Sequence, residues 1–97
     1  MTSLAPRADP RNTIRTLATD GSVQVAQKTG PDQWLLVTHV GVVPSTVGDE
    51  HVSGWHKHAR SDQCGSKAVD PYCVRPAGHG EGHSAYVLPW DYQDLRQ

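Results

Sequence analysis

The sequence predicts a small, mainly β protein, in which a three-stranded antiparallel meander precedes an irregular C-terminal loop segment. Apolar runs separated by turn dipeptides fill the first half. No window shows a convincing helical period with caps. The second half is dense in Cys, His, Gly and Pro and poor in aliphatic residues, so it cannot fold by apolar burial alone. Its cysteines and histidines indicate zinc as the stabilising element.

Length and composition predict a single domain with a thin core. The chain has 97 residues and contains eleven Val, six Leu, one Ile and no Phe, which is about 19% of the sequence. Its formal net charge is only −1, so the composition does not demand disorder. A core of this size usually needs a disulfide, a metal ion or a partner subunit to support it.

The domain organisation follows from changes in composition along the chain. Residues 1–12, with two prolines and alternating charges, predict a mobile N-terminal tail. Residues 13–97 then form one small domain. Within it, residues 13–43 form the β meander and residues 55–97 form the zinc-binding segment and tail. Residues 44–54 are rich in Gly, Ser, Thr and Asp and predict a loop between them.

The meander is expected to contain strands over residues 13–18, 22–28 and 34–43. The dipeptide Asp20-Gly21 predicts the first turn, and the tripeptide Gly30-Pro31-Asp32 predicts the second. The third strand is the most apolar stretch of the chain and should lie at the centre of the sheet.

Two thiols and two imidazoles gather within twenty residues of the C-terminal half. They belong to Cys64, Cys73, His79 and His83. Zinc favours four such donors in a tetrahedron, so these residues are the candidate metal ligands. Glycines stand next to the ligands and let a short chain turn tightly around an ion. The two histidines are four residues apart, but the glycines between them predict a loop in place of a helix.

The stretch Tyr72-Cys-Val-Arg-Pro-Ala-Gly-His-Gly-Glu-Gly-His83, with Cys64 before it and Trp90 after it, resembles a known zinc-binding segment. That segment has the form Cys…Cys-x4-Gly-His-x-Gly-x-His and occurs in small, uncharacterised proteins of actinobacteria and their phages. The resemblance covers about a quarter of the chain. It implies a structural zinc ion on the four candidate ligands and an actinobacterial or phage origin, and it implies no activity.

Other interpretations of these residues remain open from the sequence. Cys64 and Cys73 could form a disulfide in an oxidising compartment, or the four residues could be unrelated surface groups. Upstream lies a second histidine group, for which a solvated loop with a Trp anchor is favoured: His51, His56 and His58. Its His-x-His pair, His56 and His58, could alternatively replace one of the four ligands. His39 lies in the most apolar strand and is interpreted as a core or edge residue.

The donor count favours a protein that binds and does not catalyse. Four protein ligands close the coordination sphere of zinc, whereas a catalytic ion keeps one position open. Only Glu81, between the two histidines, is placed to act as a general base. We therefore expect a non-enzymatic interaction or regulatory module with a protein partner. The aromatic residues that could form its binding surface, or pack around the metal loop, are Trp55, Tyr72, Tyr86, Trp90 and Tyr92.

Three further expectations concern partners and location. A nucleic-acid-binding zinc module would use Lys57, Arg60, Lys67 and Arg75, but no strongly basic face supports it. A small zinc hydrolase using Glu81 is the other alternative. The edges of the sheet could also accept a strand from a second copy, giving a homodimer. With no apolar leader and no run of about 18 apolar residues, the chain is expected in the cytoplasm, or in the host cytoplasm if it is phage-encoded.

Overall fold

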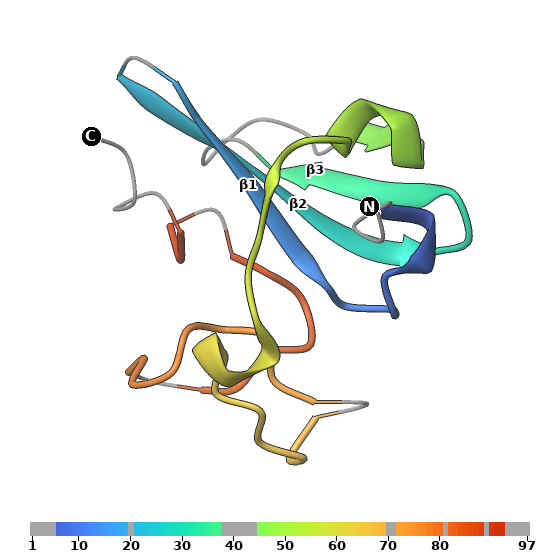
Figure 1. The fold of residues 1–97 in the computed structure, drawn as a ribbon. Coiled ribbons are helices and arrows are strands. Elements are labelled where there is room, and N and C mark those ends of the chain that lie inside the picture. Colours follow the sequence, from blue (N-terminus) through green and yellow to red (C-terminus); the bar gives the residue numbers. More distant parts are fainter. Residues whose placement is uncertain are drawn as a thin grey trace.

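The computed structural model describes residues 6–19, 21–37, 45–69, 72–80, 82–88 and 90–92. It shows one five-stranded antiparallel sheet, with the C-terminal segment lying below it in Figure 1. Helical structure among the described residues is limited to three short 3-10 turns, so the predicted mainly β class is confirmed. No helix in these ranges is both long and apolar enough to cross a bilayer.

The strands are β1 (Ile14–Thr19), β2 (Ser22–Gly30), β3 (Gln33–Val37), β4 (Ser45–Val47) and β5 (His56–Lys57). They lie in the order β4-β3-β2-β1-β5, so the central strand is β2, and the expectation that the third strand of the meander would be central was wrong. The 3-10 turns are η1 (Pro6–Ala8), η2 (Asp49–Val52) and η3 (Arg60–Asp62).

The three longest strands form the meander that the sequence predicts. Thr19 pairs with Ser22, so the β1–β2 connection is a two-residue turn at the predicted place. Gly21 in that turn has a φ of 83°, a conformation that glycine adopts without strain. Gly30 pairs with Gln33 across the second turn. Strand β3 is described as far as Val37, and the predicted continuation over residues 38–43 lies outside the described residues.

Two short strands extend this meander on opposite edges. Strand β4 joins β3 through the pair Val47–Trp34, and β5 joins β1 through the pair His56–Thr16. The expectation of a loop over residues 44–54 was therefore wrong for β4 and for η2. A strand of two or three residues is too short to show alternation in sequence, and its existence depends on a distant pairing partner.

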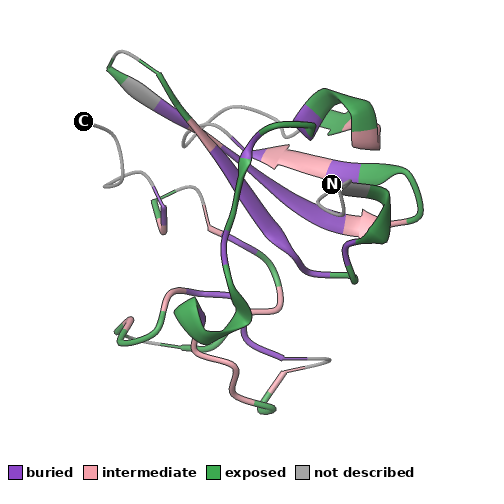
Figure 2. Cartoon of the chain, viewed as in Figure 1, coloured by how far each residue is buried: buried purple, intermediate pink, exposed green. Residues whose placement is uncertain are grey.

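Alternate side chains of each strand point to opposite faces of the sheet, and each face carries a buried cluster. One cluster forms on the face of Val23 and Val25 and comprises Ile14, Val23, Val25, Val37, Tyr72, Val74, Val87 and Tyr92. The other forms on the face of Ala26 and comprises Ala26, Trp34, Val52 and Trp55. The C-terminal segment thus packs on the first face, and the chain between β4 and β5 packs on the second. In Figure 2 the buried residues concentrate along β1 and β2.

The described part of the predicted N-terminal tail is packed against the sheet. The Asp9 carboxylate is buried and lies 2.7 Å from Arg15 Nε on β1 and 3.0 Å from Lys57 Nζ on β5. The backbone N–H of Asn12 donates to the carbonyl of Lys28 on β2 at 2.8 Å. Residues 9–12 are therefore part of the folded domain, held by a buried carboxylate that two strands share.

Candidate metal centre

The two cysteines lie on neighbouring extended segments at the start of the C-terminal half. The Cys64 N–H donates to the Arg75 carbonyl at 2.7 Å, and the Cys73 N–H donates to the Ser66 carbonyl at 2.8 Å. An antiparallel bridge between Gln63 and Pro76 continues this pairing. Backbone hydrogen bonds therefore place both thiols in one neighbourhood, although nine positions separate them in the chain.

Two local features return the histidines to the cysteines. After Pro76 the chain turns through Gly78, whose φ is 87°, and the His79 N–H donates to the Pro76 carbonyl at 3.1 Å. Further along, the Ser84 carbonyl accepts a hydrogen bond of 2.9 Å from the Val74 N–H, which brings the residue before it, His83, beside the cysteines. The described residues between the histidines are not helical, as their glycines predict.

The four candidate ligand atoms converge. One atom from each of Cys64, Cys73, His79 and His83 lies within 4.8 Å of the others. Cys64 Sγ is 3.4 Å from His83 Nδ1, and Cys73 Sγ is 3.4 Å from His79 Nε2. In a tetrahedral zinc site, with zinc–sulfur bonds of about 2.3 Å and zinc–nitrogen bonds of about 2.0 Å, a sulfur and a nitrogen lie about 3.5 Å apart. The observed spacing is thus suited to one tetrahedral metal ion.

Hydrogen bonds around this group orient its donors. His79 Nδ1 lies 2.9 Å from the Gly80 carbonyl oxygen, which can only accept, so Nδ1 carries the proton and Nε2 is left to face the cysteines. The Ser84 N–H donates to Cys73 Sγ at 3.4 Å.

The environment of the group is that of a closed site at the surface. Cys73 is buried, Cys64 and His79 are half-buried, and His83 is exposed. Both thiols are free, so the structure does not contain the disulfide that the sequence left open. Two sulfurs and two nitrogens from the protein would fill all four tetrahedral coordination positions of a bound ion. No coordination position would then be left open for a substrate.

The upstream histidines do not join the group. Among the described residues, the four-residue group is the one set of this kind that could hold a metal. His58 is buried, and its Nε2 lies 2.9 Å from Thr16 Oγ1 on β1. The exposed His51 packs its ring against Trp55, with centroids 5.8 Å apart. His39, interpreted from sequence as a core or edge residue, and Glu81, considered as a general base, lie outside the described residues.

We expect His58 to titrate below the ordinary histidine value of 6.5. Burial lowers the pKa of His58, the charge of His56 lowers it further, and Asp62 opposes this in part. The unfolded chain then takes up this proton at a higher pH than the folded chain does. Folding stability from His58 is therefore complete above about pH 6.5 and is lost as the pH falls below it. NMR titration of the imidazole would measure the midpoint, and a value at or above 6.5 would contradict this.

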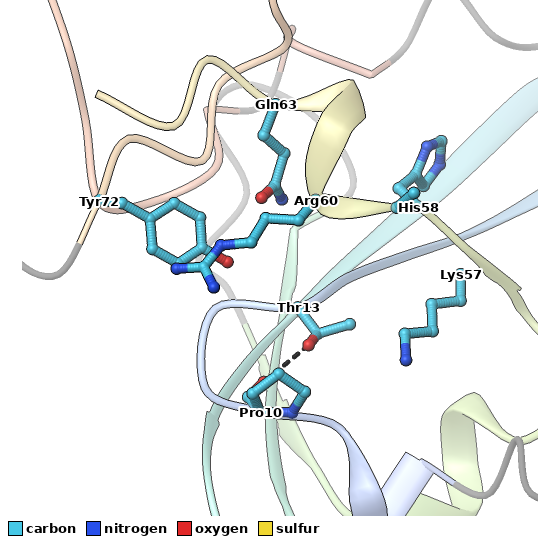
Figure 3. A pocket seen from close by; sticks show the side chains of 8 residues that line it. Pro10, Thr13, Lys57, His58, Arg60, Gln63 and Tyr72 are labelled. Carbon is cyan, nitrogen blue, oxygen red and sulfur yellow. Dashed lines mark hydrogen bonds between the residues drawn. The ribbon is translucent and has the colours of Figure 1, made fainter. Parts of the chain in front are cut away.

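The basic residues considered for nucleic-acid binding are mostly engaged within the protein. Arg75 is buried, Lys57 pairs with Asp9, and the Arg60 guanidinium stacks on the Tyr72 ring 3.9 Å from its centroid. Figure 3 shows Lys57, Arg60 and Tyr72 around a cleft of about 400 Å³. The fourth residue, Lys67, is exposed on a loop. These residues do not form a continuous basic face.

The five aromatic candidates separate into two groups. Trp55, Tyr72 and Tyr92 are buried in the two core clusters. Tyr86 and Trp90 remain 58% and 55% exposed, and they are the large hydrophobic residues that the structure shows as exposed among those it describes. Both belong to the C-terminal segment that follows the metal group.

Three residues that support this region were not recognised from sequence as structural. Gln27 on β2 is fully buried, and its amide bonds to the backbone of Ala85 and Val87. Arg75 and Asp91 form a buried ion pair of 3.2 Å. A polar residue within a predicted strand or loop gives no local signal that its partner lies tens of residues away.

No family model, curated protein or solved structure matches this chain.

Proposed function

We propose that this protein is a non-enzymatic module in which one structural zinc ion organises the C-terminal segment for binding to another protein. The convergence of two thiols and two imidazoles within 4.8 Å is the observation that supports it. The resemblance of residues 72–83 to the zinc segment of small actinobacterial and phage proteins points to the same metal and to an origin in one of these groups.

The donor set favours zinc over other metals. Two sulfurs and two imidazole nitrogens at tetrahedral spacing suit zinc, whereas an iron–sulfur cluster usually takes four thiolates. A reducing cytoplasm, that of the host for a phage-encoded protein, would keep both thiols available as ligands. Because the protein supplies all four ligands, the ion would act on structure and not as a catalyst.

A protein partner fits the surface better than a nucleic acid does. Exposed Tyr86 and Trp90 offer apolar area on the segment that the ion would order, and such residues dominate protein interfaces. The formal net charge is −1, and three of the four candidate basic residues make contacts within the chain. Nucleic-acid binding would require cations free to displace counterions.

Elemental analysis of the protein purified without a metal-binding tag tests the metal assignment. We expect one equivalent of zinc per chain. Replacement by Co(II) should give the absorption of a tetrahedral ion with both thiolate-to-metal charge transfer and visible d–d bands. Protein that contains no stoichiometric metal and does not take up Co(II) would refute the proposal.

Capture experiments with matched variants test the interaction surface. The double variant Tyr86→Ala/Trp90→Ala should keep its metal and its melting temperature, because both side chains are exposed, but should lose at least about tenfold in affinity for the partner. Lys67→Ala, which changes another exposed residue, is the control and should bind normally. Equal binding by the double variant would exclude this surface. Binding to DNA or RNA that weakens steeply with salt would instead support the nucleic-acid alternative.

A further inference from the structure

Arg75 is a buried cation that lies, in the sequence, between the second cysteine and the first histidine of the candidate metal group. Its side chain is only 10% exposed. Nη1 donates to two backbone carbonyls, those of Gly80 at 3.0 Å and Gly82 at 2.8 Å. Nε and Nη2 donate to the Asp91 carboxylate at 3.2 to 3.3 Å. The two sides of the guanidinium therefore bind two different parts of the chain.

The carbonyls that Arg75 binds belong to the loop that presents both histidines. Gly80 follows His79, and Gly82 precedes His83. A Cβ atom added at either glycine would meet nothing within 4 Å, so packing at the two glycines themselves does not hold their carbonyls in place. The hydrogen bonds from Arg75 to these carbonyls therefore add to the backbone hydrogen bonds at His79 and Ser84 in restraining the loop.

The Gly80 carbonyl also links Arg75 to the orientation of a candidate ligand. It accepts from Arg75 Nη1 at 3.0 Å and from His79 Nδ1 at 2.9 Å. By fixing this oxygen, Arg75 holds the acceptor that keeps the proton on Nδ1. His79 Nε2 is then the nitrogen that faces Cys73 Sγ, at 3.4 Å.

The other side of the guanidinium reaches the end of the C-terminal segment. Asp91 is buried and also accepts from the Leu88 N–H at 3.1 Å. The neighbouring Tyr92 donates from its hydroxyl to the Val74 carbonyl at 3.2 Å and packs, with Val87, in the cluster on the first face of the sheet. Movement of the histidine loop would therefore be transmitted through Arg75 to the residues that cover the sheet.

We infer that Arg75 is a positioning residue of the metal site, which selects Nε2 of His79 as the ligand atom and couples metal binding to the docking of residues 84–88 and 90–92 on the sheet. The inference rests on the proposed metal binding. It gives Arg75 a role inside the molecule, in place of the nucleic-acid contact considered from sequence.

The affinity test compares Arg75→Met with Arg60→Met. Methionine keeps an apolar side chain of similar length but removes every donor. We expect Arg75→Met to bind zinc 10- to 100-fold more weakly in competition with a chromogenic chelator, the usual effect of losing a group that orients a ligand. Arg60→Met, which removes an exposed arginine that stacks on Tyr72, should bind zinc within about twofold of the original chain.

A spectroscopic test separates positioning from general destabilisation. In protein loaded with ¹¹³Cd and labelled with ¹⁵N, we expect couplings from the metal to Nε2 of His79 and to Nδ1 of His83. In Arg75→Met the His79 coupling should be lost or divided between its two nitrogens. If Arg75→Met does not fold, Arg75→Lys serves the same test. Lysine keeps the charge but cannot bridge both carbonyls and Asp91 at once, so it too should disturb the His79 coupling.

The outcomes distinguish the two proposals. An original chain without a metal ion would overturn the proposed function. An original chain that binds zinc, together with an Arg75→Met variant of equal affinity and unchanged couplings, would overturn the role of Arg75 alone. Amide exchange that becomes faster over residues 84–88 in zinc-loaded Arg75→Met supports the coupling to the C-terminal segment, and unchanged exchange there refutes it.

Discussion

The Cys73→Ser variant is expected to lose its metal ion and to lower the free energy of unfolding by about 4 kcal/mol or more under metal-saturating conditions. An ion that binds only the folded chain stabilises it by about 4 kcal/mol when its concentration is a thousand times its dissociation constant. A serine hydroxyl is a much weaker zinc ligand than the buried sulfur of Cys73 that it would replace. Metal analysis and chemical denaturation followed by tryptophan fluorescence would measure both effects.

A strong chelator should have the same effect on the original chain as the substitution has. The loss of protection in amide exchange should be largest over residues 72–80 and 82–88, because these contain three of the four ligands and the residues that follow them. His51→Ala, which removes an exposed histidine of η2, is the matched control and should keep its metal. A Cys73→Ser protein that keeps one equivalent of metal, or an original chain whose unfolding ignores the chelator, would contradict the prediction.

Gln27→Leu is expected to lower the free energy of unfolding by about 3 kcal/mol or more, even with zinc bound. The Gln27 amide donates to the Ala85 carbonyl at 2.6 Å and to Asn12 Oδ1 at 2.9 Å, and it accepts from the Val87 N–H at 2.8 Å. Leucine would remove the Gln27 partner from two buried groups, Asn12 Oδ1 and the Val87 N–H, and from the part-buried Ala85 carbonyl. Each buried loss costs about 1–3 kcal/mol before the structure relaxes. Denaturant unfolding of the zinc-loaded variant would measure the change.

The same substitution at Gln24, three residues earlier in the chain, provides the control. Gln24 lies on the same strand, is half-buried, and points to the opposite face from Gln27 because their positions differ by an odd number. Gln24→Leu should change stability by no more than about 0.5 kcal/mol. If both variants were equally stable, the Gln27 amide would not be what holds the C-terminal segment on the sheet.

The sequence was informative where the signal is local. Alternation and turn dipeptides predicted β1, β2, β3 and their two connections, because side-chain direction and turn geometry depend on neighbouring residues. It was not informative for β4 and β5, which have three and two residues and are defined by their pairing with β3 and β1. The same limit applies to the aromatic residues. Nothing local distinguishes buried Tyr72 and Tyr92 from exposed Tyr86.

By itself, the sequence determined the mainly β class and the choice of Cys64, Cys73, His79 and His83 as candidate ligands, since residue chemistry and glycine spacing are written in the chain. Tertiary structure alone decided that these four converge and which nitrogen of each histidine faces the cysteines. It also decided that Arg75 holds the histidine loop and that Gln27 holds the C-terminal segment on the sheet. The physical reason is that a hydrogen bond or an ion pair depends on the distance between two groups in space. For partners up to 60 positions apart, only the folded backbone sets that distance.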